Sequence, residues 1–136
     1  MAQLKISDLS VGDWVQDKEG TPAKILGIEQ WSGDYYLNVE VNGADVGNVI
    51  AEGALPIPIT PEILEKNGSK KTEFVKDSGY EFYQSDDFYA SRVEGSKWWT
   101  IIVRNECREV VNCYVQHIHQ LQHALRLAGV EKEIEL

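Results

Sequence analysis

The sequence predicts an α+β fold: an SH3-like small β-barrel lobe, then a short helix, an antiparallel sheet and one C-terminal helix. Short runs of β-branched and aromatic residues between turn residues support the two β regions. Helix-capping residues near position 60 and near the C-terminus support the two helices. We expect residues 1–59 to form the β lobe, 60–68 a linker helix, and 69–136 the sheet with its helix. One continuous domain is the alternative.

The first 59 residues contain alternating apolar positions and close turns. Four or five short strands are expected within 11–15, 23–29, 31–41 and 46–59, and the third of these segments begins with a turn at Ser32-Gly33-Asp34. In the third of them, Tyr35, Leu37, Val39 and Val41 fall on one face. Asn42-Gly43 is a strong signal for a tight turn. Short strands with such turns are typical of a small barrel, and a curved meander is the alternative.

The linker helix has a signal at each end. Thr60 is a suitable N-cap, Pro61 fits the first helical position, and Asn67-Gly68 ends the helix. The next segments rich in aromatic and β-branched residues are TEFVKD, YEFYQ, FYASRVEG and KWWTIIVRN. A second helix is expected over 113–128, ended by Gly129, and EKEIEL is expected as an edge strand.

Composition restricts the class of partner. The net charge of −9 opposes binding to a nucleic-acid polymer. No apolar run approaches the ~18 residues of a membrane span, and the N-terminus lacks an apolar signal core. We therefore expect no membrane partner and a cytoplasmic location, which two cysteines also suit. All four arginines lie in the second half, so an anion site is expected there.

The three histidines lie within residues 117–123. His119 and His123 are four residues apart, as in zinc-binding helices, but Gln120 stands where the general-base glutamate would be. Helical projection from residue 113 puts these two histidines opposite the apolar stripe, which contains Tyr114, Ile118, Leu121, Leu125 and Ala128. Cys113 with His117 is the other pair at this spacing. We expect no metal, no cofactor and no catalytic residue.

Aromatic and arginine side chains are the more suggestive feature. Trp98 and Trp99 are adjacent in an expected strand, so one faces the core and the other faces outward. An outward tryptophan could stack on a base while arginines hold phosphate. The predicted ligand-binding residues are Trp98, Trp99, Arg104, Arg108, His119, His123 and Arg126.

The segments VGDWV, ALPIPITPEILEKNG and HQLQHALRLAGVEKEIEL resemble short proteins encoded by gut Bacteroidetes and by their phages and mobile elements. Many of those proteins have an aromatic residue after Asn-Gly, where this chain has Ser69. The resemblance implies a habitat and no catalytic mechanism.

With these patterns, we expect a non-enzymatic binding protein that sequesters a small nucleotide-like signal of host defence. A protein-interaction module, which could also self-associate as a homo-oligomer, is one alternative. A metal-dependent hydrolase that uses the C-terminal histidines is the other.

Overall fold

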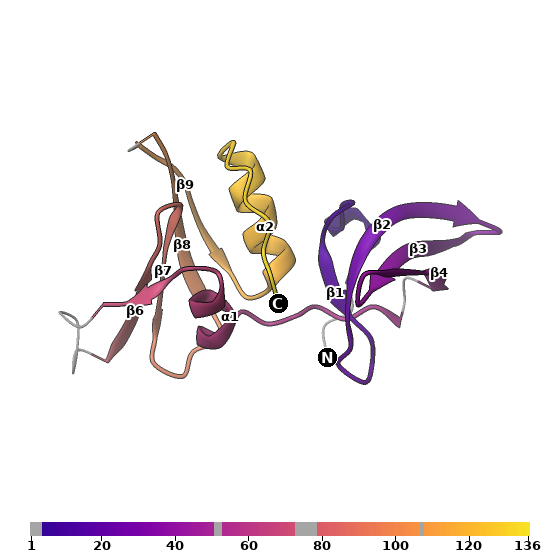
Figure 1. The fold of residues 1–136 in the computed structure, drawn as a ribbon, viewed down its shortest axis with the longest axis horizontal. Coiled ribbons are helices and arrows are strands. Elements are labelled where there is room, and N and C mark those ends of the chain that lie inside the picture. Colours follow the sequence, from indigo (N-terminus) through magenta and orange to yellow (C-terminus); the bar gives the residue numbers. More distant parts are fainter. Residues whose placement is uncertain (1–3, 51–52, 73–78, 107) are drawn as a thin grey trace. The chain divides into compact units, whose positions relative to one another are not determined.

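The computed structural model describes residues 4–50, 53–72, 79–106 and 108–136 (Figure 1). The chain divides into two compact units, Met1–Ile57 and Pro58–Leu136. Each unit contains one antiparallel sheet, and both α-helices belong to the second unit. The protein is therefore mostly β with two helices, as the predicted α+β class requires.

The first unit is an antiparallel meander. Its strands are β1 (Trp14–Gln16), β2 (Pro22–Trp31), β3 (Asp34–Val41) and β4 (Ala44–Ile50), hydrogen-bonded in that order, and a short 3₁₀ turn (Ile6–Asp8) precedes them. Two-residue turns join β2 to β3 and β3 to β4. Ser32-Gly33 and Asn42-Gly43 have positive φ at both positions, which the right-handed twist of a hairpin favours. The turn predicted at Asn42-Gly43 is confirmed.

The expected closed SH3-like barrel is not confirmed, because the first sheet is open. Among the residues that the structure describes, strand β4 pairs with β3 alone. The outer edge of β1 is bridged instead to Leu55, where the two backbone hydrogen bonds with Gln16 measure 2.9 and 2.8 Å. Short-range patterns specified each hairpin, whereas closure depends on how far the whole sheet curls. Ile25, Leu37 and their apolar neighbours nevertheless form a buried core on its inner side.

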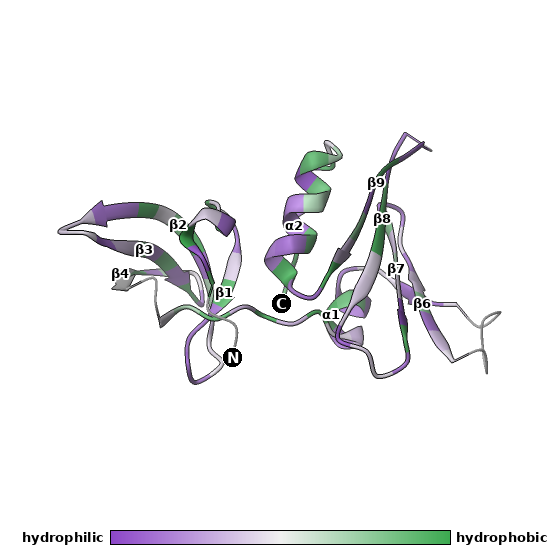
Figure 2. Cartoon of the chain, turned by 180° about the vertical axis from the view of Figure 1, so that it is seen from behind, coloured by the Kyte–Doolittle hydropathy of each residue, from purple (hydrophilic) through white to green (hydrophobic). Residues whose placement is uncertain are grey.

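The second unit is a five-stranded sheet with two helices. It contains α1 (Pro61–Lys66), β5 (Lys70–Lys71), β6 (Tyr80–Gln84), β7 (Phe88–Val93), β8 (Trp99–Asn105), β9 (Arg108–Val115) and α2 (Ile118–Leu127). The strands are hydrogen-bonded in sequence order, each antiparallel to the next. Figures 1 and 2 show α2 running along one face of this sheet, and Figure 2 shows apolar residues along β8.

The capping signals predicted at the start of α1 and at the end of α2 are confirmed. Thr60 accepts a hydrogen bond from the backbone of Ile63 at 3.3 Å, and Pro61 occupies the first turn of α1. After α2, Gly129 has φ of +76°, and the backbone N–H of Val130 donates to the carbonyl of Leu125 at 2.9 Å. Among the described residues, neither helix has the length and apolar character that a membrane span requires.

The predicted start of the second helix is wrong. Residues 108–115 form strand β9, and α2 begins at Ile118 rather than at Cys113. Tyr114 and Val115, an aromatic and a β-branched residue, favour a strand over a helix at the point where the helix was expected to begin. The expected C-terminal edge strand is also absent, since residues 131–136 form no strand. The strand expected over TEFVKD falls largely on residues 73–78, outside the described residues.

Candidate ligand-binding face

One face of the second sheet has no described helix over it. Cross-strand register aligns its side chains in two rows, because paired residues point to the same side. The first row is Phe82, Ser91, Thr100 and Tyr114, and the second row is Gln84, Tyr89, Ile102 and Asn112. None of these eight residues is buried. We call these two rows, with Trp98 and Arg104 beside them, the open face.

Two exposed aromatic rings stand at one end of the open face. Trp98 is 49% exposed, and Tyr114 is 70% exposed. Their ring centroids are 6.4 Å apart with an interplanar angle of 66°, an edge-to-face arrangement. Tryptophan and tyrosine rings are enriched where proteins bind partners, and a pair of exposed rings can stack on a ligand. The helix prediction had placed Tyr114 in the core, so this partner of Trp98 was missed.

An arginine stacked on a tyrosine stands at the other end. The guanidinium carbon of Arg104 lies 4.4 Å from the ring centroid of Tyr89, and Phe82 packs beside that ring at 5.5 Å. Arg104 Nη2 donates a long hydrogen bond of 3.3 Å to the carbonyl of Ser85. Within the part of the chain that the structure describes, no carboxylate lies at ion-pair distance from Arg104. The positive charge is therefore available to an anion.

The two ends are within reach of one elongated molecule. Tyr114 of β9 is opposite Thr100 of β8, and Arg104 lies four residues after Thr100 in β8. At about 3.3 Å per residue, the separation is roughly 13 Å. Between them lie Ile102 and the exposed amide of Asn112. The open face thus offers ring surfaces, an amide and a cation in one line.

Trp99 lies on the opposite face and is fully buried. Its indole N–H donates to the carbonyl of Ile59 at 3.2 Å, and its ring packs edge-on against Tyr83 at 5.9 Å. The guanidinium of Arg92 lies 4.4 Å from the same ring. Of the two adjacent tryptophans, Trp98 is therefore the one that a ligand can reach.

The remaining predicted ligand residues do not join the open face. Arg108 begins β9 and is exposed at the turn that follows β8. Arg126 is exposed on α2, which packs on the other side of the sheet. His119 is 3% exposed, and His123 is half-buried. The structure therefore brings Trp98 and Arg104 together on one face and separates them from the other five.

The histidines form a row at the start of α2. The rings of His117 and His119 are nearly parallel with centroids 5.8 Å apart, and His123 lies edge-on to His119 at the same distance. The expectation that His119 lies on the outer side of the helix is wrong, because the buried arc of α2 is wider than the projection assumed and also contains Gln122. Across the described ranges, no three His, Cys, Asp or Glu side chains are placed to hold a metal ion.

Cys113 does not have the properties of a nucleophile. It lies in β9 as a free thiol, and burial raises its pKa. A catalytic cysteine needs the opposite shift, which favours the thiolate. The Cys113–His117 pair considered from the sequence therefore has no chemical support in the fold.

His117 makes stability depend on pH. It is the N-cap of α2, and burial lowers its pKa from the ordinary value of 6.5. As pH falls below 6.5, the His117 imidazole takes up a proton in the unfolded chain before it does so in the folded chain. The free energy of unfolding therefore decreases as pH falls from 6.5 to the lowered pKa of His117 in the folded chain. We expect His117→Asn, which stays neutral and suits an N-cap, to reduce the loss of stability between pH 7.5 and 5.5. Urea denaturation at both pH values measures it, and an unchanged difference would contradict this role of His117.

No protein-family model, no curated protein and no solved structure matches this chain. The chemistry of the open face is therefore the basis for a functional assignment.

Proposed function

We propose that the protein binds a nucleotide-like ligand without catalysis, on the open face of its second sheet. The observation that supports this is the exposed Trp98–Tyr114 ring pair in line with the Tyr89-stacked Arg104. A base stacks on the ring pair, and the phosphates reach Arg104. The spacing of roughly 13 Å suits a nucleoside with a chain of phosphates or a second nucleotide better than a monophosphate.

Four residues of the open face have separate roles beside Arg104 in this proposal. Trp98 and Tyr114 hold the base, because stacking on aromatic rings tolerates any base. Asn112 lies between the two ends and offers both a donor and an acceptor to a sugar. Tyr89 is a positioning residue, since its ring holds the guanidinium plane of Arg104. In a phage or mobile element, as the sequence resemblance implies, such binding would sequester a host signal.

Isothermal titration with ADP and with adenosine tests the proposal. We expect Arg104→Gln to weaken ADP binding about tenfold or more, because charge-assisted hydrogen bonds to phosphate are lost. Adenosine binding should be unaffected by this change. Trp98→Ala should weaken both ligands about tenfold through loss of stacking. The matched control is Arg126→Gln, which removes an exposed arginine from α2, on the other side of the sheet.

The outcomes separate the roles. Equal losses in Arg104→Gln and Arg126→Gln would show that only net charge matters, which contradicts a site at Arg104. Absence of binding for ADP, GDP, UDP and dinucleotides would overturn the nucleotide assignment as a whole. Circular dichroism of each variant checks that its fold is retained.

A further inference from the structure

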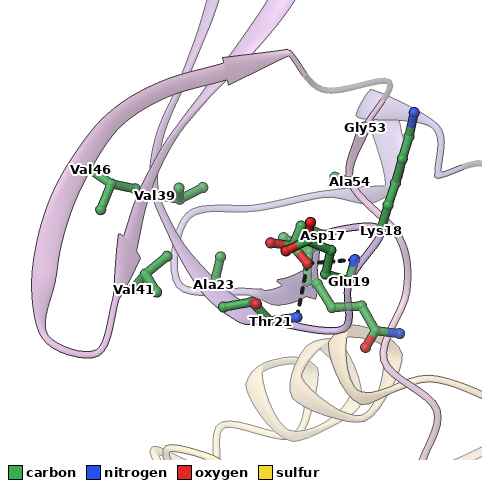
Figure 3. A pocket seen from close by; sticks show the side chains of 12 residues that line it. Asp17, Lys18, Glu19, Thr21, Ala23, Val39, Val41, Val46, Gly53 and Ala54 are labelled. Carbon is green, nitrogen blue, oxygen red and sulfur yellow. Dashed lines mark hydrogen bonds between the residues drawn. The ribbon is translucent and has the colours of Figure 1, made fainter.

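A pocket of about 590 Å³ opens on the concave side of the first sheet (Figure 3). All four strands, the β1–β2 turn and the segment after β4 contribute to it. Its lining residues are Val15, Gln16, Asp17, Lys18, Glu19, Thr21, Ala23, Val39, Val41, Val46, Gly53 and Ala54. Its volume lies within the range typical of small-ligand sites, roughly 300–1,000 Å³.

Short aliphatic side chains make the pocket. Val15, Ala23, Val39 and Ala54 form its buried wall and belong to the core of the unit. Alanine and valine leave space where larger side chains would fill the inside of a curled sheet. Because β4 does not pair with β1, that space stays accessible from outside. The interior therefore favours an aliphatic group.

The mouth of the pocket carries a fixed negative charge. Asp17 Oδ1 accepts hydrogen bonds from the backbone N–H groups of Glu19 and Thr21 at 2.8 and 2.9 Å, and the bond from Thr21 is the main cause that lowers the pKa of Asp17. Figure 3 shows Asp17 among the lining residues, whereas Lys18 extends away from it. The carboxylate of Asp17 is thus ionised and held in place by its own turn.

The other charged residues of the first unit strengthen the negative electrostatic potential at the mouth of the pocket. The first 57 residues contain nine acidic and three basic side chains, so their net charge is −6 of the total −9. A surface field of one sign raises the local concentration of ions of the opposite sign. An anionic ligand would meet repulsion at this mouth, and a cation would meet attraction.

We propose that this pocket binds an aliphatic chain that ends in a positive charge. The chain lies against Val15, Val39 and the two alanines, and the charged end stays at the mouth beside Asp17. Two sources share this chemistry, namely a free alkylamine and the side chain of a lysine in a partner protein. The site lies in a different unit from the open face and does not depend on the function proposed there.

Amide chemical shifts of the full-length protein test this site. The probes are hexylammonium, hexan-1-ol and hexanoate, which have six carbon atoms each and end in a positive, a neutral and a negative polar group. We expect hexylammonium to shift the amides of Ala23, Val39 and Ala54 saturably, and to bind about tenfold more tightly than hexanoate. Acetyl-lysine methylamide distinguishes the sources: if it binds as tightly as hexylammonium, the pocket accepts a side chain on a backbone, and if it binds only weakly, the pocket prefers the free amine.

Variants separate the apolar wall from the charge. Val46→Phe should fill the pocket and abolish binding of the amine and the alcohol alike. Val46 is 54% exposed, so the change leaves the core intact, and the control Val93→Phe alters a 55% exposed valine in the other unit. Asp17→Asn should weaken binding of hexylammonium about two- to fivefold and leave binding of hexan-1-ol unchanged.

The control for charge is Asp45→Asn. Asp45 accepts a backbone hydrogen bond from Gly47 at 2.8 Å, as Asp17 does in its turn, but it does not line the pocket. Equal effects of the two Asp→Asn changes would overturn the role of Asp17. Hexanoate binding as tightly as hexylammonium, or no saturable shift at the pocket amides with any probe, would overturn the site itself.

Discussion

Trp99→Ala is expected to destabilise the second unit by about 3–5 kcal/mol, the usual cost of removing a large aromatic side chain from a core. Trp99 is fully buried in the sheet, and its N–H donates to the carbonyl of Ile59, two residues before α1. Its loss leaves that carbonyl without its partner, and it also removes the ring on which Arg92 and Tyr83 pack. Urea denaturation of the full chain, followed by circular dichroism, measures the change.

The neighbouring tryptophan supplies the matched control. Trp98→Ala should lower the free energy of unfolding by only about 1 kcal/mol, because half of that side chain is already in solvent and its ring pairs edge to face with Tyr114. The loss in free energy of unfolding for Trp99→Phe should fall between the losses for Trp98→Ala and Trp99→Ala. Phenylalanine keeps a ring in the core but is smaller and lacks the indole N–H. Similar losses for Trp98→Ala and Trp99→Ala would mean that the sheet does not have the two faces described. The pair therefore tests the strand register on which the open face depends.

Local signals predicted the elements that depend on a few neighbouring residues. The caps of α1 at Thr60 and Asn67 occur as expected, and so does the glycine stop of α2 at Gly129. The alternation in β3 also placed Leu37 and Val39 in the core correctly. The caps depend on hydrogen bonds within one turn, and the alternation depends on the two-residue period of a single strand, so the sequence nearby is enough to specify them.

The predicted boundary between β9 and α2 was misplaced, because the apolar residues around it fit both the two-residue period of a strand and the 3.6-residue period of a helix. Tyr114 and Ile118 are four residues apart, as in a helix, although only Ile118 is helical. Gln120 marks the true start, since its side-chain carbonyl accepts from the backbone N–H groups of Gln116 and His117 at 2.9 and 3.1 Å. A glutamine three residues after the cap is a recognised start signal, and it went unused.

The candidate site was predictable only in part. Alternation shows that Trp98 and Trp99 face opposite sides, but strand order decides which side is open. The contact between Arg104 and Tyr89 joins two strands whose register is set by pairing across β7 and β8. Such contacts are non-local, so composition suggested aromatic and arginine residues without showing which of them meet. The pocket of the first unit depends on the sheet staying open, and the sequence patterns fit a closed barrel as well as the alternative of a curved meander.

Asn67 is expected to be the polar side chain whose loss costs most. It is buried at the end of α1, and its amide nitrogen donates to the carbonyls of Ile63 at 2.8 Å and Glu135 at 2.7 Å. Its side-chain oxygen accepts from the backbone N–H of Glu135 at 2.7 Å, and its backbone carbonyl accepts from Lys132 at the same distance. Asn67, together with Lys66, whose ammonium group donates to the carbonyl of Leu136, therefore attaches the last segment of the chain to the first helix.

We expect Asn67→Ala to lower the free energy of unfolding by about 2–3 kcal/mol, because three hydrogen bonds are lost and the backbone groups of Glu135 lose their partners. Hydrogen exchange should identify the cause, since the amide of Glu135 would exchange much faster while amides in β7 and β8 keep their relative order. Asn112→Ala is the control, because Asn112 is an exposed asparagine in β9, and its loss should cost about 0.5 kcal/mol or less. Slow exchange at Glu135 in Asn67→Ala would show that Lys132 and the buried Ile134 hold the segment without the amide. The side chain of Asn67 would then matter only through its hydrogen bond to the carbonyl of Ile63 within the helix.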